Sequence, residues 1–147
     1  VKCGNLFDPW KNKKFDYNIN DVSAISENIA RLSPWFKNNI PCKTGKDGTR
    51  LTIEVINKST LYLHKNGSLQ IPILNLSNSN KIIKKAKRKF KKVSFVIKKD
   101  WFLPDIMYKL KKNLYKLKKS KHIQFEEKFG KIICSTSILI CSKPYEN

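Results

Sequence analysis

The stretch Ser59–Leu76, STLYLHKNGSLQIPILNL, decides the predicted fold. It contains two apolar runs, 61–63 and 69–74, separated by Lys65-Asn66-Gly67-Ser68. Because Asn-Gly tolerates the positive φ angles of a tight turn, the stretch predicts a β-hairpin. Pro72 has no N–H to give to a strand ladder, so it predicts a bulge, a bend or a sheet edge in the second strand.

The segments around this hairpin predict one helix and further strands. Apolar residues recur at helical spacing over residues 20–32, and Ser33-Pro34 would end that helix. Strands are predicted at 40–43, at 51–56 and, two or three in number, over 122–142 with a turn near 127–130. This order predicts an α+β fold in a single domain over residues 1–147, with one helix packed on an antiparallel β-sheet.

The charge is strongly positive and is concentrated in one stretch. The 147 residues include 31 Lys and Arg and 11 Asp and Glu, for a net charge of +20. Lys81–Lys121 holds 17 of the basic residues against Asp100 and Asp105. We predict a basic, partly helical insertion over about residues 78–121, whose field favours RNA, DNA or an anionic membrane surface. A solvated lysine face without a ligand is the alternative, because Lys, Asn and Ile are abundant throughout the chain.

Aromatic residues are interleaved with these lysines. Base stacking combined with phosphate contacts is how sequence-tolerant proteins bind single strands. The alternative is that the aromatic side chains anchor the insertion on the sheet. The candidate RNA-binding residues are Lys84, Lys85, Lys87, Arg88, Lys89, Trp101 and Tyr108.

The four cysteines allow three complete pairings. One cysteine near each end of the chain suits a disulfide that ties the termini together, and disulfide use implies secretion. A zinc site formed with the two histidines is the alternative, although the chain has no Cys-x-x-Cys pair. Neither a Gly-rich phosphate loop nor a Ser-His-Asp arrangement is visible, so we predict no cofactor and no metal. No apolar run has the length of a membrane-spanning helix. The residues concerned are Cys3, Cys42, Cys134, Cys141, His64 and His122.

Several short motifs, in this order, resemble the small secreted fungal guanyl-specific ribonucleases. They are Val1-Lys2-Cys3-Gly4, Ile40-Pro41-Cys42-Lys43, Gln70-Ile71-Pro72-Ile73, His122-Ile123-Gln124-Phe125 and Cys141. The pattern is more similar still to the catalytically dead relatives of these enzymes, the RNase-like effectors secreted by powdery mildew fungi. The resemblance covers residues 1–76 and 122–142. It implies a fungal ribonuclease-like fold with a disulfide between Cys3 and Cys141.

The resemblance also implies that four catalytic positions are replaced. The strand histidine becomes Cys42, and the general base becomes Gln70, an amide that cannot take a proton at neutral pH. The phosphate-binding arginine becomes His122, and the catalytic acid becomes Ser135. The resemblance therefore implies a secreted, monomeric pseudoenzyme, a virulence effector that acts in the host cell by binding host RNA or host proteins. A plant intracellular immune receptor is a further partner that the family implies.

Two other functions stay open on the sequence. An active ribonuclease with rearranged groups would need Glu54, His64 and His122 to flank one substrate. An unrelated basic nucleic-acid-binding domain would keep its cysteines reduced.

Overall fold

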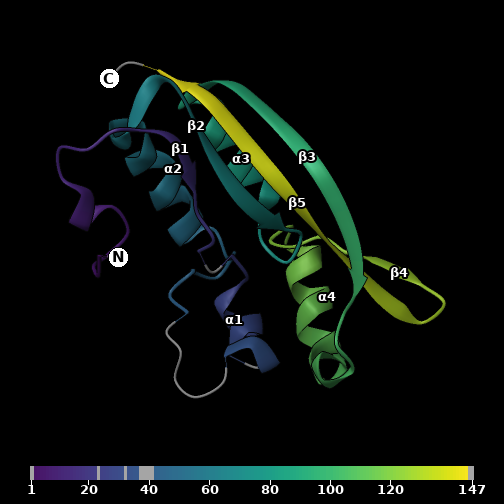
Figure 1. Ribbon diagram of the computed structural model, residues 1–147. Coiled ribbons are helices and arrows are strands. Elements are labelled where there is room, and N and C mark those ends of the chain that lie inside the picture. The colour runs from purple at the N-terminus through teal and green to yellow at the C-terminus, as the bar shows by residue number, and fades with distance from the viewer. Residues whose placement is uncertain (1, 23, 32, 37–41, 146–147) are drawn as a thin grey trace.

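The computed structural model describes residues 2–22, 24–31, 33–36 and 42–145 (Figure 1). These residues form a mixed α+β fold, so the predicted class is confirmed at this level. The sheet has the strand order β1-β2-β5-β3, and β4 also pairs with β5. The strands are β1 Phe15–Ile19, β2 Leu63–Leu74, β3 Phe90–Phe102, β4 Glu126–Lys128 and β5 Lys131–Pro144. The helices are η1 Asp8–Trp10, α1 Glu27–Ala30, η2 Pro34–Phe36, α2 Arg50–Tyr62, α3 Ser79–Lys87, η3 Asp105–Leu110 and α4 Lys111–Lys119, where η marks a 3₁₀ helix.

The sheet is antiparallel from β2 through β5 to β3, but β1 runs parallel to β2. The prediction of a wholly antiparallel sheet is therefore wrong at β1. A parallel pair needs a long crossover, and the chain between β1 and β2 supplies one through α1 and α2. The last pair of β1 with β2 is Ile19 with Gln70. Pro72 lies beyond that pair, so the sheet edge predicted for this proline is confirmed.

The predicted hairpin within Ser59–Leu76 is wrong, because α2 leads directly into one continuous strand. Gly67 is buried inside this strand, and a Cβ there would lie 3.0 Å from the carbonyl oxygens of His64 and Phe15. The glycine therefore allows β1 to approach closely and does not form a turn.

The predicted strand at 51–56 is also wrong, since these residues belong to α2. Thr52, Val55, Ile56 and Ser59 are buried at helical spacing. Two of these four positions hold small polar residues, so the apolar pattern alone did not show the buried face.

The predicted helix over 20–32 shortens to α1. Asn20, the first residue of the predicted helix, instead extends the line of β1, and its backbone N–H donates to the carbonyl of Gln70 at 3.0 Å. Ile25 and Ile29 are nevertheless buried, as the apolar stripe required. The predicted strand at 40–43 begins outside the described residues, and Cys42 and Lys43 are not in a strand.

The basic stretch 78–121 is partly helical, as predicted. It is not a separate insertion, because it contributes a strand to the sheet. Its strand β3 pairs with β5 from Phe90, opposite Pro144, to Phe102, opposite Ile133. The closing strands are β4 and β5. The turn predicted between them is confirmed at residues 129 and 130, where both φ angles are positive.

The structure has two apolar cores, one toward each end of the sheet. In Figure 1, α2 and α3 lie along the upper part of the sheet, and α1 and α4 lie near its lower part. Successive strand residues point to opposite faces. Leu139 and Cys141 of β5 are buried in one core, whereas Ile132 and Cys134 of the same strand are buried in the other. The first, here named the α3 core, includes Val55 and Ile56 of α2 and Ile82 and Ala86 of α3. The second, the α4 core, includes Ile29 of α1, Met107 of η3 and Leu114 and Leu117 of α4.

Candidate nucleic-acid interface

Helix α3 presents the predicted basic residues on its outer face. Asn78 caps the helix, because its side-chain oxygen accepts from the backbone N–H of Lys81 at 3.1 Å. Ile82 and Ala86, four residues apart, are buried against the sheet, so the lysines between and after them point outward. We name the basic surface by its members, of which Lys85 and Lys89 are half-buried and the others exposed: Lys84, Lys85, Lys87, Arg88, Lys89, Lys91 and Lys92.

The basic surface has no acidic partner within the described part of the chain. Residues 81–92 include eight Lys or Arg and no Asp or Glu. Lys81, at the rim, pairs with Asp47 at 2.8 Å, and on the neighbouring helix α2 Glu54 pairs with Lys58 at 2.9 Å. None of the ion pairs between described residues includes a member of the basic surface. Its charge is therefore not compensated locally.

Two structural roles offer alternative explanations for some of these lysines. Lys84, Lys85 and Lys87 lie in the last turn of α3, where cations stabilise the helix dipole by about 0.3–1 kcal/mol each. Lys91 and Lys92 lie on β3, the edge strand, where lysine discourages pairing with another sheet. These roles account for the sign of the charge but do not require so many uncompensated cations.

Trp101 and Tyr108, the two predicted stacking residues, both make structural contacts. The indole Nε1–H of Trp101 donates to Thr136 Oγ1 at 3.0 Å, and its ring meets that of Trp35 edge to face, with the centroids 5.6 Å apart. The hydroxyl of Tyr108 accepts from the backbone N–H of Ile132 at 2.7 Å. These contacts favour the alternative that the aromatics anchor their segment.

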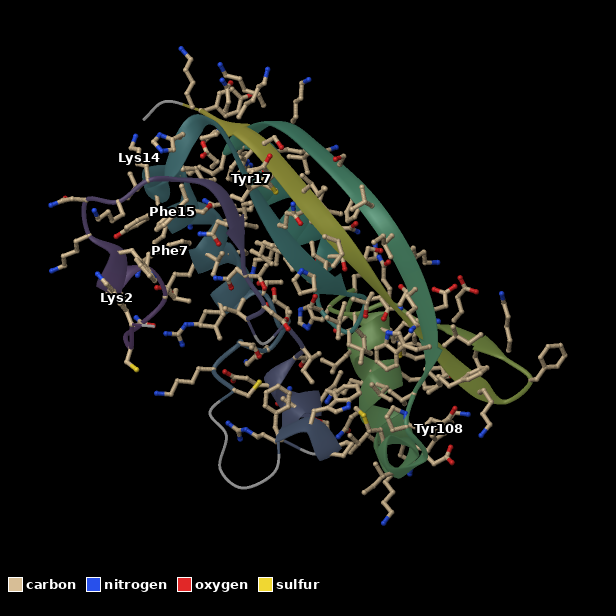
Figure 2. The ribbon with its side chains drawn as sticks, viewed as in Figure 1. Lys2, Phe7, Lys14, Phe15, Tyr17 and Tyr108 are labelled. Carbon is tan, nitrogen blue, oxygen red and sulfur yellow. The ribbon has the colours of Figure 1, made fainter. Side chains whose placement is uncertain are left out.

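These two aromatics also lie far from the basic surface. Phe90, next to α3, pairs with Pro144, whereas Trp101 pairs with Cys134, ten positions away on β5, which corresponds to about 33 Å. Figure 2 shows Tyr108 at the end of the molecule that carries α4. The structure therefore does not bring the predicted lysines and aromatics into one site.

A second cationic group surrounds a pocket of about 550 Å³ between α1 and α4. Among the described residues that line it, three side chains are basic and none is a carboxylate. His122 is the only predicted site residue among the lining residues, which are Asn28, Arg31, Lys46, Asn113, Lys116, Leu117, Ser120 and His122. Sequence reasoning missed the rest, because Arg31 and Lys46 lie outside the basic stretch and only folding places them beside α4.

The four positions that the resemblance matches to catalytic residues do not converge. Gln70 pairs with Ile140 of β5, whereas Ser135 lies five residues earlier on that strand, about 16 Å away along the sheet. His122 lines the pocket beside α4. Cys42 is half-buried against the α4 core, and its Sγ lies 3.5 Å from Thr44 Oγ1.

The groups of a rearranged ribonuclease are separated as well. His64 is exposed at the start of β2, whereas His122 precedes Gln124, whose backbone N–H donates to the carbonyl of Asn75 just beyond the other end of β2. The regular part of the strand between them, Ser68–Leu74, alone spans about 20 Å. Glu54 pairs with Lys58 and touches neither histidine, so the structure forms no acid–base pair from these three groups.

The predicted disulfide between Cys3 and Cys141 is not formed, and all four cysteines, which lie in the described residues, are free thiols. Cys3 is exposed near the N-terminus, whereas Cys141 is fully buried in the α3 core, so the two sulfurs are in different environments. Burial raises the pKa of Cys134 and of Cys141 from 9.0 to about 12. The structure therefore does not contain the disulfide that the resemblance implies.

Within the described residues, no group of three or more His, Cys, Asp and Glu side chains is arranged to hold a metal ion. None of the described helices is long and apolar enough to cross a membrane. Comparison of the chain with protein-family models, curated proteins and solved structures gives no match.

Proposed function

We propose that this protein binds single-stranded RNA without cleaving it, through the basic surface on α3 and the start of β3. The observation that carries the proposal is the charge of residues 84–92, which hold seven Lys or Arg and form no ion pair with a described residue. Each phosphate that a lysine or arginine neutralises releases condensed counterions, so such a surface gains free energy on meeting a polyanion. A rigid helix that rests on a packed core presents these cations in fixed positions.

The non-catalytic part of the proposal rests on the separation of the candidate groups. General acid–base catalysis needs both groups within hydrogen-bonding reach of one substrate. His64 and His122 lie at opposite ends of β2, and Gln70 and Ser135 are likewise apart. Incubating the purified protein with single-stranded RNA should therefore give no cleavage above background. Cleavage that disappears with His64→Ala or His122→Ala would instead favour the rearranged ribonuclease.

The RNA-binding proposal is tested by charge reversal with a matched control. In the test variant, Lys84, Lys85, Lys87, Arg88 and Lys89 become Glu. In the control, five exposed lysines outside α3 that form no ion pair with described residues become Glu: Lys11, Lys13, Lys109, Lys112 and Lys119. Both variants have the same net charge, so they differ only in where the charge is removed.

Affinity for a fluorescent oligouridylate is measured by anisotropy over a range of salt concentrations. Each phosphate contact contributes about −0.7 to the slope of log affinity against log salt. We expect the α3 variant to lose most of the slope and the control to keep it. Equal losses in both variants would show that RNA responds only to net charge, and unchanged binding in the α3 variant would show that its lysines are a solvated face.

Several properties stay predictions of the resemblance alone. They are secretion, effector activity in a host cell, a host-protein or immune-receptor partner, and the ribonuclease-like fold. The free thiols of Cys3 and Cys141 do not support them. A mass measurement under non-reducing conditions tests the disulfide that the family implies, because each disulfide lowers the mass by two hydrogens.

A further inference from the structure

We propose that the pocket between α1 and α4 is a binding site for a nucleoside monophosphate, either free or as the 5′-phosphorylated end of an RNA strand. The site is separate from the basic surface and goes beyond the RNA binding proposed above. Its volume of about 550 Å³ lies in the range of about 300–1,000 Å³ that is typical of small-molecule sites.

The charges that line the pocket select an anion. Arg31 at the C-cap of α1, Lys46 in the turn before α2 and Lys116 in α4 lie around one hollow. None of the three forms an ion pair with a described residue. Three cations that share a hollow repel one another, and a phosphate would remove that repulsion while accepting their hydrogen bonds.

The remaining lining residues suit the rest of a nucleotide. Leu117 offers an apolar contact, and the His122 ring offers a flat surface on which a base can stack. The amides of Asn28 and Asn113 each carry donors and an acceptor, as recognition of a base edge or a ribose requires. Inorganic phosphate would use only the cationic part of this set.

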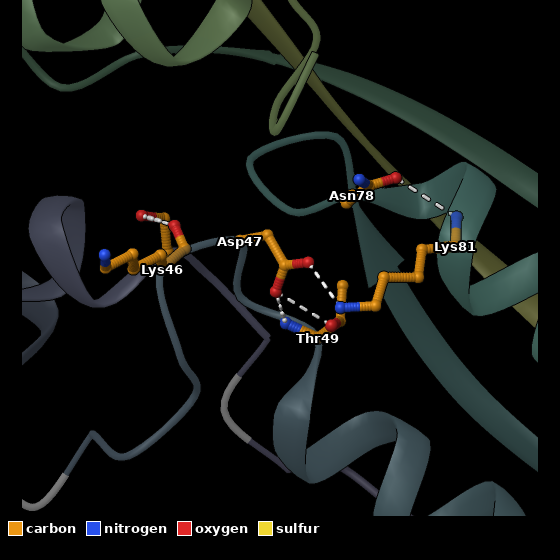
Figure 3. A network of polar contacts seen from close by, with 6 residues as sticks. Lys46, Asp47, Thr49, Asn78 and Lys81 are labelled. Carbon is orange, nitrogen blue, oxygen red and sulfur yellow. Dashed lines mark hydrogen bonds and ion pairs between the residues drawn. The ribbon is translucent and has the colours of Figure 1, made fainter. Parts of the chain in front are cut away.

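The wall that carries Lys46 is held in place by hydrogen bonds from several elements (Figure 3). Ser26 Oγ donates to the carbonyl of Lys46 at 2.6 Å, and the backbone N–H of Gly45 donates to Glu27 Oε1 at 3.0 Å. The next residue, Asp47, accepts from Thr49 Oγ1 at 2.8 Å and from Lys81 Nζ at 2.8 Å. Partial burial opposes ionisation of Asp47, but the hydrogen bonds from Lys81 and Thr49 lower the pKa of its carboxyl.

Gly48 is required for the same turn. Its φ is +72°, and a Cβ there would lie 2.6 Å from the backbone carbon of Ile25. Because only glycine fits this position without strain, the turn that carries Lys46 is fixed against α1.

The opposite wall is the end of α4, which closes with a Schellman motif. The backbone N–H of His122 donates to the carbonyl of Leu117 at 3.0 Å, and that of Lys121 donates to the carbonyl of Lys118 at 3.0 Å. Lys121 takes the left-handed conformation, with φ +59°, where glycine is usual. The motif brings His122 to the pocket and satisfies helix carbonyls that would otherwise repel a phosphate.

The test is isothermal titration calorimetry of the full chain with 5′-AMP, adenosine and inorganic phosphate as probes. We expect 5′-AMP to bind more tightly than either of the other probes. Arg31→Gln and Lys116→Gln should each weaken 5′-AMP binding at least about tenfold, as loss of a charge-assisted hydrogen bond does. Lys112→Gln, which removes an exposed lysine of α4 outside the pocket, should leave the affinity unchanged. All three residues are exposed, so circular dichroism should show folded variants.

Three outcomes would overturn the proposal: no 5′-AMP binding at millimolar concentration, phosphate binding as tight as 5′-AMP binding, or affinities that Lys116→Gln and Lys112→Gln change equally. Comparing RNA strands with a 5′-phosphate and a 5′-hydroxyl distinguishes the two sources of the ligand. A preference for the phosphorylated strand that Lys116→Gln abolishes identifies the strand end, and no preference identifies the free nucleotide. Failure of the RNA proposal would appear separately, in the α3 variant.

Discussion

The two ends of the sheet are built alike but use their lysines differently. At one end α3 covers its core through Ile82 and Ala86, and at the other α4 covers its core through Leu114 and Leu117. Both helices carry lysine on their outer faces. The lysines of the basic surface have no acidic partner among the described residues, whereas several lysines at the α4 end form ion pairs or hydrogen bonds.

These engaged lysines hold the α4 end together. Lys111 pairs with Glu127 at 2.9 Å, and Lys131 approaches Asp105 at 3.4 Å. Lys118 Nζ donates to the carbonyl of Phe125 at 2.7 Å and lies 4.3 Å from the centroid of its ring. The number of lysines alone therefore does not identify a polyanion surface. The positions of the acidic and aromatic side chains around the lysines identify it.

The largest expected effect comes from removing one large side chain from each core. Phe90 is fully buried in the α3 core, so Phe90→Ala should lower the free energy of unfolding by about 3–5 kcal/mol. Trp101→Ala should lower it by about 3 kcal/mol, because this half-buried ring packs on the α4 core and bonds Thr136. Urea unfolding followed by circular dichroism measures both values.

The control is Phe102→Ala, which removes the neighbouring ring, 66% exposed, and should cost less than about 1 kcal/mol. Folded Trp101→Ala protein should bind RNA as the unmodified chain does. If it stays fully stable but loses RNA affinity, Trp101 stacks on bases and the anchoring interpretation is wrong.

The sequence predicted the α+β class, the turn at the start of β5, the edge at Pro72 and the outward basic residues of α3. These rest on local properties: turn chemistry, the missing proline N–H and helical spacing. The prediction from sequence was wrong where a residue contacts a segment that is distant in the sequence. Gly67 accommodates β1 rather than a turn, and Thr52 and Ser59 take core positions of α2 that an apolar pattern does not reveal.

The candidate site divides in the same way. The residues of the basic surface were predictable because they lie close together in the sequence, over residues 84–92. The pocket was not, because Arg31, Lys46 and Lys116 come from three separate segments. Their convergence depends on the turn at Gly48 and on the packing of α1 against α4, neither of which leaves a periodic signal.

Each core contains one buried thiol, Cys134 in the α4 core and Cys141 in the α3 core. Cys134 and Cys141 keep their protons up to a pKa of about 12 in the folded chain, whereas unfolded thiols lose theirs near 9.0. The stability that this difference provides is fully present below pH 9 and is lost as the pH rises toward 12. Each thiol should lower the free energy of unfolding by about 1.4 kcal/mol per pH unit in that window.

Urea unfolding at pH 8 and pH 10 tests this dependence in the unmodified chain and in the Cys134→Ala and Cys141→Ala variants. Each substitution should remove half of the pH dependence that these two thiols contribute. If the pH dependence of a variant equals that of the unmodified chain, the thiol removed in that variant is accessible to water and hydroxide in the folded unmodified chain. The exposed Cys3 should react with a thiol reagent first in every variant.

The smallest effect separates the two kinds of lysine directly, by comparing Lys84→Gln with Lys111→Gln. Lys84 is exposed and forms no ion pair with a described residue, so its loss should change the free energy of unfolding by less than about 0.5 kcal/mol. The salt slope of oligouridylate binding should nevertheless become shallower by about 0.7, the value of one phosphate contact. Lys111→Gln removes an exposed ion pair and should cost about 0.2–1 kcal/mol, with the slope unchanged. Equal changes of slope in the two variants would mean that RNA meets both helices, and the distinction between the two ends of the sheet would then lie in stability alone.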